Sequence, residues 1–288
     1  QIFEKSGNKR GQANALRVIG YGHISKGEYP KALEFTQRSL KIAEEIQDKQ
    51  IIAACLKDEG SIYFRQGEQQ KALDDLEKGW KIAEEIQDRR IQSQLLSNFA
   101  LVYGEQGDHK RELENYERAA KISKEIGDRF QQCLVSLNSG STYYDMSQFQ
   151  KAYGFIQKGT SLAEEIGNNR FLIGGLIGLG LVQFEYGDNG GGLANFKKAL
   201  PIAEKLGDKF MLSYVLSELG WSSTLAGNYE AALNYQQRAL QVRKEMDDKR
   251  AIAYSYILLG DIYQMRKEYD QAIKNYNEGL SISEPSGI

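Results

Sequence analysis

The eight letters KIAEEIQD occupy residues 41–48, and the same eight letters return at residues 81–88. An identical copy forty residues away indicates an internal repeat, and periods of about 20–50 residues are typical of solenoids and related arrays. The spacing holds along the chain, because one column of equivalent positions contains Gly20, Gly60, Ala100, Gly140, Gly180, Gly220 and Gly260. The sequence therefore divides, without insertion or deletion, into seven units at 9–48, 49–88, 89–128, 129–168, 169–208, 209–248 and 249–288.

Each unit contains two helix-like segments. In the first unit, apolar and small residues recur every three or four positions near 9–26 and again near 29–46, which is the period of an amphipathic helix. The stretch between them contains Gly27, and the whole chain has only three prolines, which suits a mostly helical protein. No single hairpin can bury its apolar face alone, so we expect neighbouring hairpins to stack into an all-α solenoid with one continuous core.

The repeated motif is predicted to end one helix and to begin the next. Adjacent helical residues point about 100° apart, so the two glutamates of each copy cannot converge on one proton or metal ion. Glycines follow the motif at Gly127, Gly167 and Gly207, where they suit a left-handed helix stop. The residues expected to cap the following helices are Asp48, Asp88, Asp128, Asn168, Asp208 and Asp248.

These residues resemble a known repeat family. Unit 7 carries the pattern most fully, with Tyr256, Leu259, Gly260, Tyr263, Tyr269, Ala272, Tyr276, Gly279 and Leu280. The pattern resembles the tetratricopeptide repeat, and the period of 40 residues in place of 34 is similar to the long-repeat subtype of Pins-type adaptors, kinesin light chains and bacterial signalling proteins. The resemblance implies a right-handed superhelix of seven helical hairpins, with the first helix of each unit lining the concave face.

The two ends of the chain fall outside complete units. Residues 4–9 align with the end of a second helix one period later, so residues 1–8 are interpreted as the remnant of a preceding repeat. We therefore expect a segment of a longer protein. At the other end, Pro285 replaces a glutamate of the motif, and the last helix is expected to stop near it.

Composition restricts the functional classes. The formal net charge is −2 and the pI about 5.9, whereas a nucleic-acid-binding protein usually has a basic excess. The start of the chain has no apolar leader, and the longest apolar run is too short to span a bilayer. Cys55 and Cys133 make no disulfide framework and are interpreted as buried thiols. We expect a cytoplasmic protein without membrane insertion and without a nucleic-acid partner.

No catalytic constellation is recognised. The chain has two histidines, of which His23 occupies an apolar position filled by tyrosine in other units and His109 lies in a turn. No metal-ligand spacing, phosphate loop or nucleophile elbow is present, so we predict no enzyme, cofactor or metal site. Unit 5 has extra glycines at Gly174, Gly175 and Gly178. They indicate either close helix packing or a soft joint in the array, and we favour the joint.

The resemblance also assigns a partner-binding groove. The family's concave positions lie six and three residues before the column glycine and one, four and five after it. Counted in this way, the groove positions in the first three units include Asn14, Arg17, Tyr21, Ala54, Lys57, Phe64, Arg65 and Gln94. The later units contribute Ile177, Phe184, Tyr214, Trp221 and Tyr254, and aromatic residues exposed in a groove suggest anchors for a partner. These aromatic side chains could instead pack between repeats or lie under another segment of the same polypeptide.

The family's carboxylate clamp is not supported, because the position after the column glycine is never asparagine here. Asn98 and Asn138 match another family position, which can hydrogen-bond a peptide backbone.

Three hypotheses for function follow. The leading one is a non-catalytic interaction scaffold that holds a protein or peptide segment in the groove, its acidic part near Arg17, Lys57 and Arg65 and its apolar part near Phe184 and Trp221. The second is the sensor or regulatory arm of a multidomain signalling enzyme such as a caspase-like protease, kinase or cyclase, in which the partner is a domain of the same polypeptide. The third is self-association through the end repeats.

Overall fold

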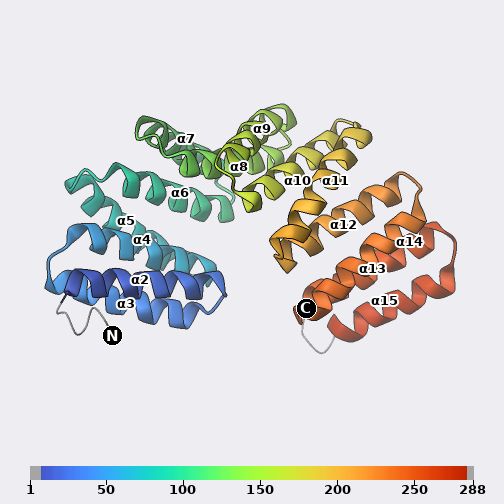
Figure 1. The fold of residues 1–288 in the computed structure, drawn as a ribbon, viewed down its shortest axis with the longest axis horizontal. Coiled ribbons are helices and arrows are strands. Elements are labelled where there is room, and N and C mark those ends of the chain that lie inside the picture. Colours follow the sequence, from blue (N-terminus) through green and yellow to red (C-terminus); the bar gives the residue numbers. More distant parts are fainter. Residues whose placement is uncertain (1–7, 284–288) are drawn as a thin grey trace. The chain divides into compact units, whose positions relative to one another are not determined.

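The computed structural model describes residues 8–283, and helices account for almost all of this range (Figure 1). The first helices of the seven units are α2 Lys9–Ser25, α4 Lys49–Arg65, α6 Arg89–Glu105, α8 Arg129–Asp145, α10 Asn169–Glu185, α12 Lys209–Leu225 and α14 Lys249–Met265. The second helices are α3 Tyr29–Glu45, α5 Gln69–Glu85, α7 His109–Glu125, α9 Phe149–Glu165, α11 Asn189–Leu206, α13 Tyr229–Glu245 and α15 Tyr269–Ser283. No strand occurs among residues 8–283. The prediction of paired helices every forty residues is confirmed, with α2 and α3 each ending one residue before the predicted limit.

The helices group into two compact units, Gln1–Thr142 (unit N) and Tyr143–Ile288 (unit C). In unit N, the first helix α4 contacts both α2 and α6, and in unit C the first helix α12 contacts both α10 and α14. Successive second helices make no comparable contact in the described part of either unit. The first helices therefore form the more tightly packed layer of each unit, and the second helices cover its outer side.

The column glycines allow the two helices of a hairpin to approach closely. A Cβ atom built on Gly180 would lie 2.3 Å from the ring of Phe196, and one on Gly260 would lie 2.4 Å from the ring of Tyr276. These large residues stand sixteen positions after the glycine and fill the space that the missing side chain leaves. Phe196 is fully buried as a result, and around it lie Ile173, Leu176, Val215 and Leu219 in the main core of unit C.

The predicted helix caps are confirmed at all six positions. Each side chain accepts a hydrogen bond from the backbone N–H three residues later, for example Asp48 from Ile51 at 3.1 Å and Asn168 from Phe171 at 3.1 Å. The other four caps are Asp88, Asp128, Asp208 and Asp248. Such a cap satisfies a backbone donor that the helix itself leaves without a partner, and each contributes about 1 kcal/mol.

The left-handed stop is a property of the column and not only of its glycines. Gly127, Gly167 and Gly207 have φ values of 69°, 66° and 69°, which confirms the prediction. Gln47 and Gln87 adopt the same conformation at 56° and 54°, although their Cβ atoms disfavour it. The packing of one hairpin on the next therefore sets the geometry of this turn. The residue type changes only the free-energy cost of adopting it.

The second glutamate of each motif copy has a structural role. Glu45 pairs with Lys9 at 3.0 Å, Glu245 with Lys209 at 3.0 Å, and Glu85 with Lys49. Each pair joins the end of a second helix to the start of the first helix of the same repeat. These side chains lie on the solvent face, where single ion pairs contribute little to stability. Two predictions concern residues that lie almost wholly outside the described range. They are the assignment of residues 1–8 to a preceding repeat and the end of the last helix near Pro285.

Replacing Gln87 by glycine should raise the free energy of unfolding by about 0.5–1 kcal/mol, because glycine removes the Cβ strain of a left-handed residue. The matched change is Gly127→Ala at the same column position, which should lower it by a similar amount. Urea titration followed by circular dichroism measures both. A Gln87→Gly variant no more stable than the parent chain would show that the glutamine side chain compensates the strain.

Candidate functional site

The predicted partner-binding residues lie on the first helices of both units. Those in unit N are Arg17, Tyr21, Lys57, Phe64, Arg65, Asn98 and Asn138, and those in unit C are Ile177, Phe184, Tyr214, Trp221 and Tyr254. The two sets are described separately below.

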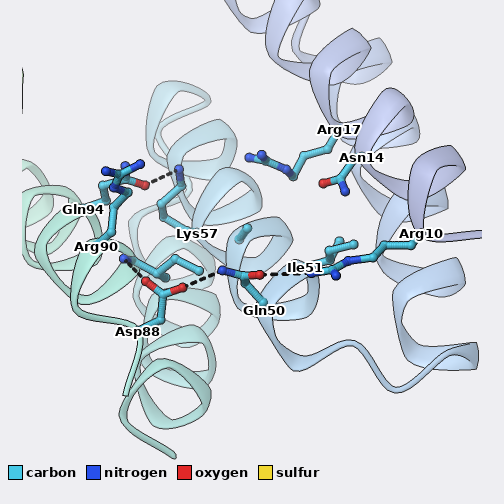
Figure 2. Close-up of a pocket in the computed structure, with 11 residues that line it drawn as sticks. Arg10, Asn14, Arg17, Gln50, Ile51, Lys57, Asp88, Arg90 and Gln94 are labelled. Atoms are coloured by element: carbon cyan, nitrogen blue, oxygen red, sulfur yellow. Dashed lines mark hydrogen bonds between the residues drawn. The ribbon is translucent and has the colours of Figure 1, made fainter. Parts of the chain in front are cut away.

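A polar pocket of about 290 Å³ lies among α2, α4 and α6 in unit N (Figure 2). Five of the predicted groove positions line it, namely Asn14, Arg17, Ala54, Lys57 and Gln94. Arg10, Gln50 and Arg90 complete its rim together with Asp88, Ile51 and Ile91. Four basic side chains and one carboxylate therefore face this pocket.

A ladder of side-chain hydrogen bonds crosses the pocket from one first helix to the next (Figure 2). Arg10 donates to the amide oxygen of Gln50 at 3.2 Å, and the amide nitrogen of Gln50 donates to Asp88 at 2.9 Å. Lys57 donates to the amide oxygen of Gln94 at 3.1 Å. The amide groups of this ladder can also exchange hydrogen bonds with a polypeptide backbone, as extended ligands require.

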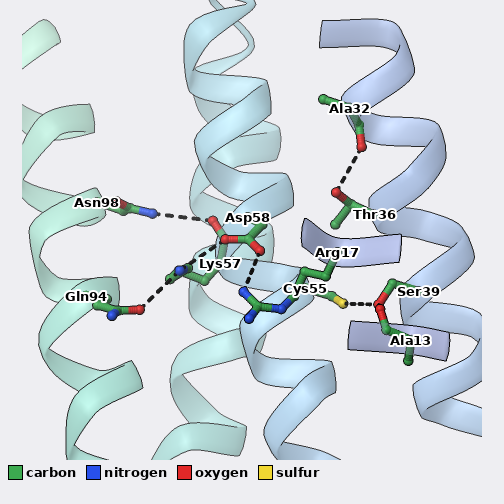
Figure 3. Close-up of polar contacts among 10 residues, drawn as sticks. All are labelled: Ala13, Arg17, Ala32, Thr36, Ser39, Cys55, Lys57, Asp58, Gln94 and Asn98. Carbon is green, nitrogen blue, oxygen red and sulfur yellow. Dashed lines mark hydrogen bonds and ion pairs between the residues drawn. The ribbon is translucent and has the colours of Figure 1, made fainter. Parts of the chain in front are cut away.

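Asp58 pairs with two basic residues of the pocket lining (Figure 3). Its carboxylate is 3.1 Å from Nη1 of Arg17 and 3.0 Å from Nζ of Lys57. Asp58 is only 5% exposed, so water screens these pairs less than it would at the surface. Arg17 and Lys57 are held in place by this carboxylate, and the pair carries a smaller net charge than the sequence alone suggests.

The remaining predicted residues of unit N differ in availability. Tyr21 and Arg65 are exposed, whereas Phe64 packs against the core formed by Leu76, Leu95 and their neighbours. Asn98 donates to the backbone oxygen of Lys57 at 3.3 Å (Figure 3). Asn138 hydrogen-bonds to the hydroxyl of the buried Tyr116. Both asparagines therefore have partners within the chain in the absence of a ligand.

Unit C presents an aromatic surface on α12 and α14. Tyr214, Trp221 and Tyr254 are 40%, 38% and 53% exposed. The ring of Phe184 on α10 supports Trp221 from behind, edge to face, with a centroid distance of 4.8 Å, and Phe184 itself stacks on Phe196. Trp221 is thus an exposed ring on a rigid base, which is the usual form of an interface anchor.

Ile177 does not belong to this surface. It is 4% exposed and lies in the core cluster of unit C, which also contains residues of α11 and α12. The extra glycines of unit 5 are partly explained by the packing of α10 against α9. A Cβ atom on Gly175 would lie 2.2 Å from the hydroxyl of Thr160, and one on Gly178 would lie 3.2 Å from Ile156, whereas Gly174 faces open space. Close packing accounts for Gly175 and Gly178, and the soft joint stays a prediction.

The sequence analysis missed Arg10, Gln50 and Arg90. These residues stand forty positions apart, ten before each column residue, so the period itself contained the signal. The family pattern did not include this position, because it maps only five positions per unit.

His23, Cys55 and Cys133 are packed against other parts of the chain. His23 stacks on Phe35 at 5.3 Å and bonds to Glu28 at 2.5 Å, as a packed histidine would. Cys55 and Cys133 are buried, and burial raises the pKa of each thiol to about 11, so both stay protonated at neutral pH.

Over residues 8–283, no group of three or more histidine, cysteine or acidic side chains is placed to hold a metal ion. Within the same range, none of the helices combines the length and apolar character that crossing a bilayer demands.

Stacked helical hairpins with a forty-residue period define an α-solenoid built from repeats. The model of the tetratricopeptide repeat matches residues 11–85 and 214–284, which together make up just over half of the chain. The chain therefore belongs to the tetratricopeptide repeat family. The model of anaphase-promoting complex subunit 5 matches residues 101–176. No curated protein matches the sequence significantly.

Three solved structures illustrate the likeness in fold. BtubC (BKLC) from P. vanneervenii is 20% identical with a TM-score of 0.66, and the alignment covers 76% of this chain and 92% of that one. The signal transduction ATPase PH0952 from Pyrococcus horikoshii, which has a tetratricopeptide repeat sensor, is 15% identical with a TM-score of 0.77, and 96% of this chain matches 43% of that one. A Rap protein complexed with Competence and Sporulation Factor is 16% identical with a TM-score of 0.66, over 95% of this chain and 76% of that one.

The replacement Asp58→Asn should lower the free energy of unfolding by about 2 kcal/mol, because it leaves two half-buried cations without a carboxylate. Urea titration measures the change. Asp74→Asn serves as the control, since Asp74 is exposed on α5 and bonds only to Gln70, and it should shift stability by less than about 0.5 kcal/mol. Equal effects of the two changes would remove the structural role given to Asp58.

Proposed function

We propose that this chain is a non-catalytic scaffold that binds segments of partner proteins on the faces of its first helices. The observation that carries the proposal is the aromatic surface of unit C, where Trp221 is exposed and yet rigidly supported by Phe184. Monomeric proteins rarely expose several large rings together unless they bind something there. The Rap protein solved with Competence and Sporulation Factor shows that this kind of fold is compatible with ligand binding.

The polar pocket of unit N would act differently from the aromatic surface of unit C. Its amide ladder and its basic rim suit the backbone and acidic side chains of an extended segment. Arg17, Lys57 and Arg65 would orient such a segment, while Tyr21 on the neighbouring surface would add apolar contact. Water-accessible polar contacts of this kind give specificity more than affinity.

The scaffold is proposed to act without chemistry of its own and to reside in the cytoplasm. Among residues 8–283, no group of histidine, cysteine and acidic side chains is placed to hold a metal ion. Two buried cysteines that form no disulfide suit a reducing compartment.

A second candidate is the sensor arm of a larger signalling protein. It is favoured by the match to PH0952, in which a chain of this extent makes up 43% of the whole and the repeats are described as a sensor. The partner segment would then belong to another domain of the same polypeptide. Self-association through the end repeats is the third candidate, and light scattering at two protein concentrations tests it directly.

Replacing Trp221 by alanine should weaken segment binding about tenfold or more, because an anchoring ring typically contributes 2 kcal/mol or more. The assay selects a displayed random-peptide library on the immobilised 288-residue chain and measures the enriched peptides on the variant. Tyr269→Ala is the matched control, since Tyr269 is 60% exposed but lies on the second helix α15. Peptides that bind both variants equally well would refute the placement of the site on the first helices of unit C.

A further inference from the structure

One stripe of α12 joins a carboxylate to two aromatic rings. Tyr214, Glu218, Trp221 and Leu225 are spaced four, three and four residues apart, so they share one face of the helix. Glu218 is therefore flanked along the helix by the rings of Tyr214 and Trp221. Tyr254 occupies the position of Tyr214 on the next first helix, and α12 and α14 are in contact.

Charges of neighbouring groups act on two tyrosines of unit C. The pKa of the Tyr214 hydroxyl is raised by burial and, after that, by the charges of Glu218 and Tyr254. The pKa of the Tyr144 hydroxyl is raised to about 12 by burial, by its 3.0 Å hydrogen bond to Glu185 and by the charges of Glu218 and Tyr214. A second tyrosine–carboxylate pair, Tyr144 on α8 and Glu185 on α10, is thus joined directly in unit C.

The carboxylate of Glu218 has no ion-pair partner within 4.0 Å in residues 8–283. The basic group whose charge acts on Glu218 is Arg243 on α13, which is 6% exposed and is held by Ser255 at 2.5 Å and Ser217 at 2.7 Å. Arg243 replaces the small residue, alanine or serine, that the other six units carry at this column position. Its hydrogen bonds to the serines hold it in place, and its guanidinium carbon lies 6.0 Å from the ring centroid of Tyr254, which is still 53% exposed.

We propose that the stripe of Tyr214, Glu218 and Trp221, together with Tyr254, binds a lysine or arginine side chain of a basic partner segment. The face offers such a group two kinds of attraction, one from its aromatic rings and one from its carboxylate. Aromatic rings attract a cation over their faces, and a carboxylate between them supplies the counter-charge. Glu185 and Asp261 on the neighbouring first helices extend the negative charge along the segment's path. This inference rests on the proposed binding function of unit C and names its ligand.

The charge state of Glu218 gives the proposal a distinctive signature. Burial raises its pKa to about 7, and the positive charge of Arg243 lowers it only in part. A cation binds the ionised form, whose fraction rises about tenfold between pH 6 and pH 8, while a lysine ligand remains charged throughout. Affinity for a basic segment should therefore increase by up to about tenfold over this range.

The experiment uses Trp221 as the reporter. The chain has two tryptophans, so Trp80→Phe leaves Trp221 as the only one, and hexalysine is titrated into this protein with fluorescence detection. Hexalysine should change the emission and bind more tightly at pH 8 than at pH 6, whereas hexaglutamate should leave it unchanged. Glu218→Gln should weaken hexalysine at pH 8 by about tenfold and flatten the pH dependence. Glu230→Gln, an exposed glutamate on α13, should do neither.

The outcomes separate this inference from the proposed function. No emission change, an equal response to both peptides, or an unaltered pH profile in Glu218→Gln overturns the cation site. If library-selected peptides still depend on Trp221 but contain no excess of lysine or arginine, the cation site falls and the scaffold stands. If Trp80→Phe does not fold, the same titration of the parent chain, with Trp221→Phe abolishing the signal, decides the question.

Discussion

The close approach of the two helices of each hairpin is the constraint on which the structure depends. At Gly180 and Gly260 the first helix has no side chain, and Phe196 and Tyr276 fill the space from the second helix. Where the column carries Ala100, the facing residue is Tyr116, which is 1% exposed, so a methyl group is accommodated there. Because every hairpin closes in the same way, a strict period of forty residues can be maintained, and each first helix presents the same positions to the same surface.

A strict period also makes departures from it informative. Most columns hold residues of one kind, since each unit packs on the next in the same geometry. Arg243 breaks a column of alanines and serines, and its buried guanidinium is satisfied by Ser217 and Ser255. Trp221 and Glu218 are likewise the only tryptophan and the only glutamate of their columns. Packing does not require these residues. Their presence on the surface of unit C therefore indicates a role other than stabilising the fold.

Local chemistry made the helices, caps and turns predictable from the sequence. Asp48 and Asn168 cap because the acceptor and the backbone N–H are three residues apart, and Gly127 adopts a left-handed conformation that glycine tolerates. The site was predictable only in part. The period placed Arg17 and Lys57 on one face, but their pairing with Asp58 depends on contacts across helices. The burial of Ile177 depends in the same way on how α10, α11 and α12 pack together, which no spacing along the chain reveals.

Ion pairs within the protein change which unit is expected to select ligands by charge. The sequence predicts a basic site in unit N from Arg17, Lys57 and Arg65. In the structure, however, Arg17 and Lys57 share the carboxylate of Asp58, and Arg10 pairs with the cap Asp48 at 2.9 Å. Their field beyond the surface is therefore small, and hydrogen bonding rather than net charge distinguishes ligands there. Glu218 in unit C is partly buried and has only the fixed Arg243 behind it. A carboxylate without a direct ion pair, in a poorly screened position, interacts more strongly with a charged ligand than basic groups that already share a carboxylate. Electrostatic selectivity in this protein should consequently reside on the aromatic surface of unit C.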